Sequence, residues 1–329
     1  MSGSRAPASH PDPREDARRS EVLLHARGLT KTFGDFTAVD GIDVEVVKGE
    51  SFGFLGPNGA GKSSTMKMVA ATSPPSSGDL RIFGLDPLVD GPAIRARLGN
   101  CPQQDNLDEE ITVEENLHVY GRYFGLSRKV IRERTDELLD FAQLTERRRD
   151  TVEPLSGGMK RRLTIARSLV NNPEILLLDE PTTGLDPQAR HVLWDRLFRL
   201  KRRGVTLIIT THYMDEAEQL CDRLVVMDHG RIVAEGSPRS LIRAHATREV
   251  LELRLPLAEP ADHTDAAHLV EGIGDRVEAL PDRLLLYTDH GDGALEAVHA
   301  RGIDPISSIV RRSTLEDVFL HLTGRTLVD

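Results

Sequence analysis

Residues 56–64, "GPNGAGKSS", match the phosphate-binding pattern GxxxxGK[ST]. They stand between a run expected as a strand (50–56) and a segment expected as a helix (62–71), which is the context that the pattern requires. In such a loop, backbone N–H groups converge on β- and γ-phosphate oxygens, the lysine adds positive charge, and the serine hydroxyl ligates Mg²⁺. The sequence therefore predicts a nucleotide site. Its candidate residues are Gly56, Pro57, Asn58, Gly59, Ala60, Gly61, Lys62, Ser63 (also the Mg²⁺ ligand) and Ser64.

Two adjacent carboxylates end the run "EILLLDE" (174–180), whose continuous apolar character is typical of a central strand buried on both faces. At the ligand edge of such a sheet, Asp179 would hold Mg²⁺ through its water shell. Glu180 is our candidate for the general base that orients or polarises an attacking water. A purely structural turn is the alternative interpretation of this pair.

Three further side chains could complete the site. His212 follows a strand (205–212) expected beside the Asp179 strand, so we interpret it as a contact to the γ-phosphate. The Gln103 amide could complete a Mg²⁺ or water shell, although Gln104 beside it could do the same. Phe33 could stack on an adenine ring or belong to the core, and the sequence leaves both alternatives open.

A second phosphate-binding pattern lies at residues 155–163, "LSGGMKRRL". Ser156, Gly157 and Gly158 stand where a helix would begin, and they offer a hydroxyl and backbone N–H donors at its positive end. The stretch contains no nucleophile, metal ligand or general base. Its basic residues, Lys160, Arg161 and Arg162, are expected to form a solvated helix face, and contact with the nucleotide is the alternative.

The elements that must position these residues form an α/β pattern over residues 21–246, with a mostly parallel sheet. Residues 222–236 indicate two strands around a His-Gly turn and hence an antiparallel portion. A mostly helical insert covers 105–172, where Thr112 and Glu115 form a capping box.

The two ends of the chain differ from this pattern. Residues 1–20 are expected to be a disordered tail, because they are rich in Pro, Ser, Arg and Asp. Residues 247–329 combine alternating strand-like runs (249–255 and 282–289) with helical segments (292–301 and 314–322). We therefore expect a small α+β domain after the α/β domain.

Bulk composition excludes several classes of protein. The formal net charge of −10 argues against a general nucleic-acid binder, which would show a basic excess. No apolar run approaches the roughly 18 residues of a membrane span. Cys101 and Cys221 stand far apart with no CxxC pattern, so they are expected to be small buried hydrophobic residues rather than a disulfide or metal site.

The order of these motifs resembles that of ABC transporter ATP-binding subunits, over about 225 residues. The stretches that carry the resemblance are "GPNGAGKSS", "PQ", "LSGGMKRR", "LLLDEPTTGLDP" and "TTH". The segments 101–125 and 155–194 and the terminal "LEDVFLHLTGR" are most similar to nodulation ATP-binding proteins, which drive lipo-oligosaccharide export. They are more distantly similar to daunorubicin-resistance-type drug-export ATPases.

This resemblance implies a P-loop NTPase fold, an ABC nucleotide-binding domain with a mixed sheet and a helical subdomain, followed by the small α+β domain. It implies ATP and Mg²⁺ as cofactors. Phe33 takes the adenine-stacking position, Gln103 is the lid glutamine and His212 the switch histidine. Asp186 matches the loop that communicates across a dimer. Ser156, Gly157 and Gly158 would cap the γ-phosphate held by a second subunit. Met159 departs from the Gln that is usual after "LSGG".

The function implied is that of an ATPase subunit of a bacterial exporter, on the cytoplasmic face of the cell membrane. Its partners would be an ABC-2-type transmembrane permease, contacted through residues 105–172, and a second ATP-binding subunit. The substrate would be drug-like, lipid or oligosaccharide-type, with no direct contact to nucleic acid. A soluble ABC ATPase acting on nucleic acid or the ribosome, and an importer ATPase, are the alternatives. A GTPase is disfavoured because the chain lacks an NKxD motif, and a kinase is disfavoured because it would have no use for "LSGG".

Overall fold

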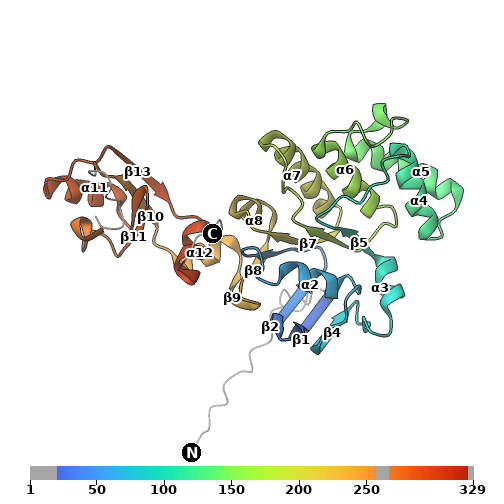
Figure 1. Cartoon of the computed structure of the whole chain (residues 1–329), viewed down its shortest axis with the longest axis horizontal. Helices are drawn as coiled ribbons and strands as arrows, with labels where there is room; N and C mark the ends of the chain where they lie inside the picture. The colour runs from blue at the N-terminus through green and yellow to red at the C-terminus, as the bar shows by residue number, and fades with distance from the viewer. Residues whose placement is uncertain (1–20, 257–266, 325–329) are drawn as a thin grey trace, which may run out of the picture. The chain divides into compact units, whose positions relative to one another are not determined.

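The computed structural model describes residues 21–256 and 267–324. The chain divides into two compact units: one comprises the chain up to Ser51 together with Ser63–Ile208, and the other comprises Phe52–Lys62 and Ile209 onward. Figure 1 labels many of the elements of both.

A three-stranded antiparallel sheet opens the first unit. Its order is β2 (Phe36–Val47), β1 (Val22–Phe33) and β4 (Ser77–Ile82). This antiparallel sheet differs from the mostly parallel sheet that the sequence predicts. Its long strands carry register shifts, which interrupt the strict alternation by which a half-buried strand is identified.

A six-stranded mixed sheet carries the apolar runs that the sequence singled out. Strands β5 and β6 pair parallel, β3 and β8 pair parallel, and β8 pairs antiparallel with β9. The run "ILLL" before Asp179 is fully buried, which confirms a central strand. The strand order is β5 (Leu98–Cys101), β6 (Ile175–Asp179), β7 (Thr206–Thr211), β3 (Ser51–Leu55), β8 (Arg223–Asp228) and β9 (Arg231–Gly236).

The helices of the first unit include the predicted helical insert. The Thr112–Glu115 capping box is present, since Thr112 N donates to Glu115 Oε2 at 2.8 Å and Glu115 N donates to Thr112 Oγ1 at 3.2 Å. Within residues 187–202, Leu193, Leu197 and Leu200 form a buried stripe along one helix. The helices are α2 (Lys62–Val69, begun by Lys62 of the second unit), α3 (Gly91–Arg97), α4 (Val113–Tyr123), α5 (Arg128–Ala142), η1 (Thr145–Arg147), α6 (Gly157–Ser168) and α7 (Pro187–Arg202).

The second unit contains the predicted His-Gly turn and two short helices, α8 (Met214–Leu220) and α9 (Pro238–His245). His229 and Gly230 have φ of 45° and 78°, as a two-residue hairpin turn between β8 and β9 requires.

The same unit ends in a four-stranded antiparallel sheet, which agrees with the predicted α+β character. Helix α11 (Gly291–Ala300) packs on one face, and α12 (Leu315–Thr323) contacts the other through Leu320. Val318 and Phe319 of α12 also pack with side chains of α8 and α9. The strand order is β11 (Arg276–Leu280), β12 (Arg283–Thr288), β10 (Glu249–Arg254) and β13 (Ser307–Arg312), and η2 spans Ala267–Val270.

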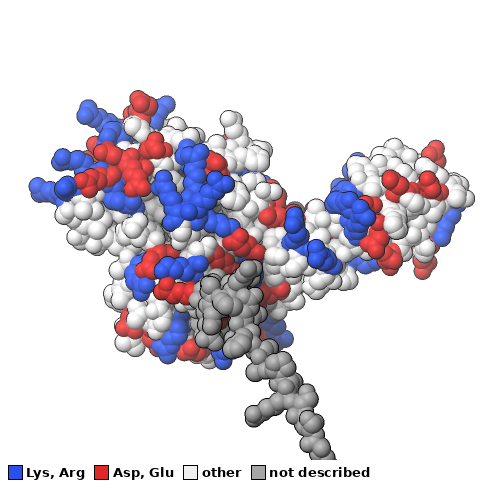
Figure 2. Space-filling model, turned by 180° about the vertical axis from the view of Figure 1, so that it is seen from behind, with Lys and Arg blue, Asp and Glu red and all other residues white. Residues whose placement is uncertain are grey.

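The predicted tail lies outside the described residues. Among residues 21–256 and 267–324, no helix has the length and apolar character that a bilayer span requires. On the face drawn in Figure 2, acidic side chains lie among the basic ones.

Candidate functional site

The phosphate loop joins β3 to α2, as its pattern predicts, and packing within the second unit fixes its start. Gly56 N donates to Thr211 O at 3.2 Å. A Cβ at position 56 would lie 2.3 Å from Met227 O, so the close approach of β8 requires glycine there. Gly59 has a φ of 82°, which glycine adopts without steric cost.

Lys62 lies under this loop and is 4% exposed. Its Nζ donates to Gly56 O at 2.6 Å and to Pro57 O at 2.9 Å. The ammonium is therefore held against the backbone whose N–H groups the pattern assigns to phosphate oxygens.

A second group of predicted residues meets in the first unit, at the end of β6. Ser63, the residue after Lys62, donates its Oγ proton to Asp179 Oδ1 at 3.2 Å. A hydroxyl and a carboxylate are hard oxygen ligands, the type that Mg²⁺ prefers, and Mg²⁺ usually takes its remaining ligands from phosphates and water. No cluster of three or more His, Cys, Asp or Glu side chains suited to a metal occurs in the described part of the chain. The donor set therefore fits a nucleotide-linked Mg²⁺ rather than a cation held by protein alone.

Glu180 is fixed in position by its backbone and by two side chains. It has a φ of 45° and is 7% exposed. This left-handed conformation costs roughly 1–2 kcal/mol for a residue other than glycine. Gln103 Nε2 donates to Glu180 Oε2 at 3.0 Å, and Thr183 Oγ1 donates to the same oxygen at 3.1 Å. Gln103 therefore contacts the carboxylate of Glu180 directly.

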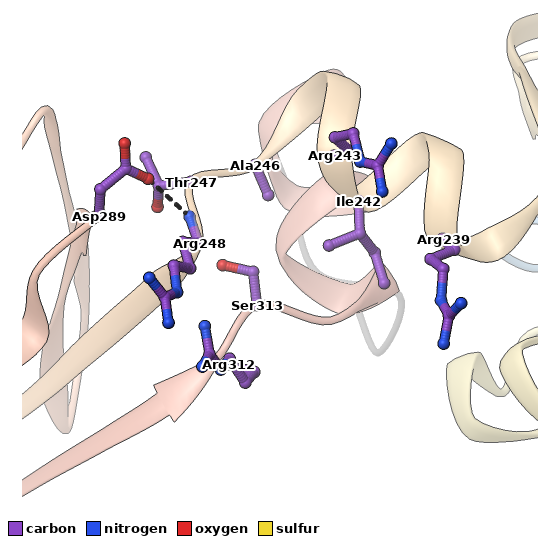
Figure 3. Close-up of a pocket in the computed structure, with 9 residues that line it drawn as sticks. All are labelled: Arg239, Ile242, Arg243, Ala246, Thr247, Arg248, Asp289, Arg312 and Ser313. Carbon is purple, nitrogen blue, oxygen red and sulfur yellow. Dashed lines mark hydrogen bonds between the residues drawn. The ribbon is translucent and has the colours of Figure 1, made fainter.

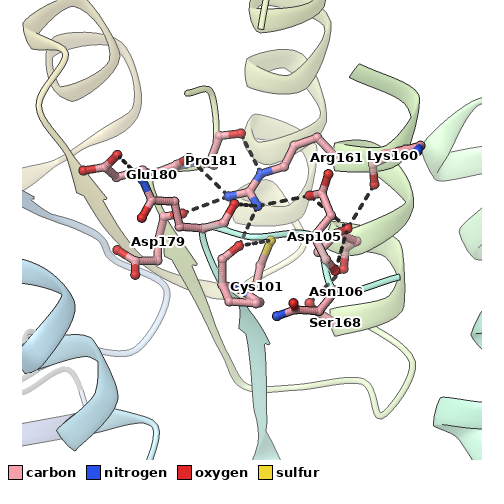
Figure 4. Close-up of polar contacts among 12 residues, drawn as sticks. Cys101, Asp105, Asn106, Lys160, Arg161, Ser168, Asp179, Glu180 and Pro181 are labelled. Carbon is pink, nitrogen blue, oxygen red and sulfur yellow. Dashed lines mark hydrogen bonds and ion pairs between the residues drawn. The ribbon is translucent and has the colours of Figure 1, made fainter. Parts of the chain in front are cut away.

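Arg161 contradicts the solvated helix face that we expected for residues 160–162. It is 4% exposed and is the centre of a hydrogen-bond network (Figure 4). Its guanidinium also lies 3.4 Å from Asp105 Oδ1. A guanidinium has five N–H donors, so one side chain can hold two loops together. The main-chain carbonyls to which it donates are those of Pro102, Gln103, Asp179, Glu180 and Pro181.

The neighbours of Arg161 are also engaged. Lys160 Nζ lies 2.6 Å from Glu109 Oε1, and Arg162 Nε donates to Ala142 O at 2.8 Å. Further along α6, Arg167 donates to Asp105 O and Asn106 O at 2.8 and 2.7 Å. Sequence reasoning missed these roles, because a run of basic residues on a helix gives no signal of which ones turn inward.

The helix start predicted at Ser156–Gly158 is confirmed. Ser156 is the N-cap of α6, and its Oγ accepts a hydrogen bond from Met159 N at 3.3 Å. A Cβ built on Gly157 would meet no described atom within 4 Å, whereas one on Gly158 would lie 3.2 Å from Ala189 Cβ. Packing within the described chain therefore gives no reason for glycine at position 157.

Three predicted site residues remain, and each lies at the end of a different element: Asp186 before α7, His212 after β7 and Phe33 at the end of β1. Asp186 caps α7, and its Oδ1 accepts a hydrogen bond from Ala189 N at 2.9 Å. The His212 ring directly follows β7, and its centroid lies 4.1 Å from that of Tyr213. Phe33 is 54% exposed, so the core alternative for this residue is wrong.

Both cysteines are free and buried, as the sequence predicted. Burial raises the pKa of the Cys101 thiol to about 11, which keeps it protonated and unreactive near neutral pH.

Comparisons with known proteins show the family of the chain. Residues 39–183 match a family model described as "ABC transporter", and residues 262–324 match "Nodulation factor export protein NodI, C-terminal domain". The chain is 45% identical over 308 residues to the Nod factor export ATP-binding protein I of Cupriavidus metallidurans, and 46% identical to that of Rhizobium sp. strain N33. Each alignment covers 94% of this chain and 99% of the relative.

Solved structures give the same result for the fold. A structure titled as the ATP binding subunit of an ABC transporter is 32% identical, with a TM-score of 0.62, and the match covers 68% of this chain and 92% of that one. A second, titled as a dimeric post-hydrolysis ATP-binding cassette bound to ADP and Pi, is 27% identical with a TM-score of 0.61, covering 65% and 98%. The chain therefore belongs to the ATP-hydrolysing subunits of ABC transporters, in the group of Nod factor export ATP-binding proteins.

Proposed function

We propose that this chain energises export of an oligosaccharide-type substrate through a separate membrane-spanning permease. The observation that carries this proposal is the similarity to Nod factor export ATP-binding proteins along 94% of the chain, which includes the C-terminal region as well as the ATPase motifs. Drug-like and lipid substrates belong to the wider class considered from the sequence. The relatives' names favour an oligosaccharide.

The two groups of site residues would act on one ATP molecule. The two groups are adjacent in the chain, because Lys62 of the phosphate loop directly precedes Ser63, which bonds to Asp179. Lys62 would exchange its bonds to Gly56 O and Pro57 O for phosphate oxygens. Ser63 and Asp179, with Gln103, would hold Mg²⁺, which would neutralise phosphate charge when bound.

Glu180 would orient and polarise the attacking water. The bonds from Gln103 and Thr183 to its Oε2 support this role, because they leave the position of the carboxylate little freedom. His212 would contact the γ-phosphate, and Phe33, exposed at the end of β1, would stack on adenine.

A second copy of the chain would complete the site. Ser156, Gly157 and Gly158 would present the N-terminal end of α6 to the γ-phosphate held by the partner subunit. Asp186 would lie in the loop that communicates between the subunits. The exposed positions of Ser156 and Gly157, and the absence of a packing reason for glycine at 157 within the described chain, support this arrangement.

The remaining assignments concern the membrane. The permease would be of the ABC-2 type and would contact the helical subdomain of about residues 105–172. The chain would sit peripherally on the cytoplasmic face of a bacterial membrane. We also propose residues 21–246 as the ATP-binding domain and 247–329 as the accessory domain.

The first test concerns hydrolysis. Glu180→Gln should still bind ATP while turnover falls by at least about 100-fold, the scale of a lost general base. Glu174→Gln, at the opposite end of the same strand run, is the matched control and should turn over ATP normally. Normal turnover in Glu180→Gln would overturn the assignment of the base. Lys62→Ala should instead weaken ATP binding itself.

The second test concerns the pair of subunits. In the Glu180→Gln background, ATP should produce a dimer in light scattering, and Gly157→Asp should abolish it by placing a carboxylate against phosphate. Gly293→Asp is the control, because Gly293 also lies in the first turn of a helix, with no described atom closer than 3.9 Å to its built Cβ. Equal dimerisation in both variants would contradict the proposed contact.

The third test concerns export. Affinity purification of the chain from native membranes should recover a multi-span permease, and the reconstituted pair should transport a lipo-oligosaccharide in an ATP-dependent manner. Purification without any permease would count against the exporter role while leaving the ATPase assignment intact.

A further inference from the structure

A pocket rich in arginine lies within the second unit, and none of the residues that line it is among those assigned to ATP (Figure 3). Its volume of about 740 Å³ falls in the range of small-molecule sites. Its walls come from α9, from the chain entering β10, and from the ends of β12 and β13. We call it the arginine pocket. It is lined by Arg239, Ile242, Arg243, Ala246, Thr247, Arg248, Asp289, Arg312 and Ser313.

Positive charge in the arginine pocket exceeds the negative charge that faces it. Arg248 and Arg312 approach one Glu249 oxygen at 3.7 and 3.4 Å, so a single carboxylate serves both. Asp289 Oδ1 accepts a hydrogen bond from the backbone N of Arg248 at 3.0 Å. Within the described chain, Arg239 and Arg243 have no ion-pair partner. The pocket therefore has unbalanced positive charge available to an anion.

Ser313 supplies the second, independent observation. It is 7% exposed, and its Oγ has no hydrogen-bond partner among the described residues. A buried hydroxyl without a partner is costly, so an oxygen-bearing ligand in the pocket would satisfy it. Figure 3 shows the Ser313 hydroxyl pointing toward the side of the pocket that carries Arg248.

Arg239 also gains no electrostatic stabilisation from its own helix. It follows Pro238 in the first turn of α9, where the helix dipole disfavours a cation. A ligand anion would turn this unfavourable position into a favourable one. Arginine suits phosphate in particular, since its planar fork can donate two parallel hydrogen bonds to phosphate oxygens.

We infer that the arginine pocket binds a phosphate group, carried either by a small soluble molecule or by a lipid headgroup. The group would be held by Arg239 and Arg243 from α9 and by Arg248, Arg312 and Ser313 from the sheet side. Such a ligand would tie α9 to the C-terminal sheet, and its binding would weaken as salt rises.

The test uses the full chain carrying Lys62→Ala, which weakens phosphate binding at the loop of residues 56–64. The soluble probe is inorganic pyrophosphate, measured by calorimetry. The lipid probe is phosphatidic acid in phosphatidylcholine vesicles, measured by co-sedimentation against pure phosphatidylcholine. Arg239→Gln with Arg243→Gln should weaken binding at least about tenfold. The control pair, Arg128→Gln with Arg132→Gln, removes the same charge from exposed positions of α5 and should change binding less than about twofold.

The two probes separate the two sources of phosphate. Loss confined to pyrophosphate supports a soluble ligand, and loss confined to phosphatidic acid supports a headgroup. Ser313→Ala should weaken the same probe. The inference is overturned when neither probe binds the Lys62→Ala chain, or when the pocket pair and the control pair lose binding equally. None of these outcomes depends on hydrolysis, so failure here is distinct from failure of the proposed export function.

Discussion

Arg161 in the ATPase region and Arg311 in the C-terminal region are both withdrawn from solvent, but they hold different kinds of partner. The Arg161 side chain is 5% exposed and donates mainly to main-chain carbonyls. The Arg311 side chain is 27% exposed and contacts carboxylates, with Glu252 Oε1 at 2.5 Å and Asp317 Oδ2 at 2.7 Å. The Arg161 guanidinium therefore holds loops together, whereas the Arg311 guanidinium joins strand β13 to helix α12.

The two arginines therefore support different parts of the protein: Arg161 supports the residues proposed for hydrolysis, and Arg311 supports the packing of the C-terminal sheet. The carbonyls that Arg161 holds belong to the loop of Gln103 and the turn of Glu180, so Arg161 sets the main-chain path on which the proposed base depends. In α12 the partner of Arg311 is Asp317. Arg311 therefore joins that helix to its own strand, β13, and through Glu252 to β10. Removing Arg161 should affect hydrolysis, whereas removing Arg311 should affect only the C-terminal sheet and its helix.

The largest effect is expected from Arg161→Met. Several buried carbonyls would lose their donor at once, which should cost about 3 kcal/mol or more of unfolding free energy and should abolish measurable ATP turnover. Trp194 lies buried in α7 and is the single tryptophan of the chain, so its fluorescence reports unfolding of the ATPase region.

Arg161→Lys separates folding from positioning. Lysine keeps the charge but has three donors on a point-like group, so it cannot reproduce the fork. We expect a Trp194 transition closer to wild type together with at least a tenfold loss of turnover, on the order of 1.4 kcal/mol in activation free energy. Wild-type turnover in this variant would show that Arg161 does not position Glu180.

A smaller effect is expected from Arg311→Met. The Asp317 side chain is 1% exposed, so loss of its partner leaves a buried charge and should cost about 2 kcal/mol. Hydrogen exchange of β10 and β13 amides should speed up, while the Trp194 transition and ATP turnover stay unchanged. A shift of the Trp194 transition by the same amount would contradict the separation of the two regions.

The ion pair between Arg311 and Asp317 should make the stability of the C-terminal sheet depend on pH. Burial alone would raise the pKa of Asp317, but hydrogen bonds from Arg311 and Thr314 outweigh burial and lower it. A lowered pKa in the folded state gives stability that is complete above the unfolded value, about pH 3.9, and is lost as pH falls through the folded value. The stability gap between wild type and Asp317→Asn, measured by hydrogen exchange of β10, should therefore be constant near neutral pH and shrink below about pH 4. Asp304→Asn, at an exposed position, should show no such gap.

The smallest effect is expected from Lys160→Ala, next to Arg161 in the same helix. Its partner Glu109 is 55% exposed, and such surface pairs contribute about 0.5 kcal/mol or less. Turnover should stay within about twofold of wild type. A loss comparable to that of Arg161→Lys would mean that positive charge, rather than the hydrogen-bond pattern of Arg161, matters in α6.

The sequence alone predicted the residues whose roles depend on short patterns of neighbouring residues. The phosphate loop, the carboxylates after a continuously apolar strand, the N-cap at Ser156 and the capping box at Thr112 depend on spacing and on neighbours in the chain. The first two features carry the proposed ATP site, and the apolar runs predicted the strands on which it lies.

What the sequence could not show depends on distant contacts. Arg161 bonds Pro102 and Pro181, which lie 59 and 20 residues away, so no local periodicity marks it as buried. The exposure of Phe33 follows from its place at a hairpin end, and the pairing of Arg311 with Glu252 follows from strand register. The antiparallel sheet of β1, β2 and β4 was missed for the same kind of reason, because bulges break its alternation.

The cap of α6 has a consequence for how a second subunit could recognise ATP. A serine hydroxyl has two lone pairs and one proton, and in Ser156 a lone pair accepts the hydrogen bond from Met159 N. Capping therefore uses an acceptor site and does not require the proton. One atom can begin the helix in its own chain and still donate outward to a phosphate oxygen. Ser156→Ala should remove both functions together, whereas Ser156→Asp should keep the cap and turn the outward donor into a negative charge.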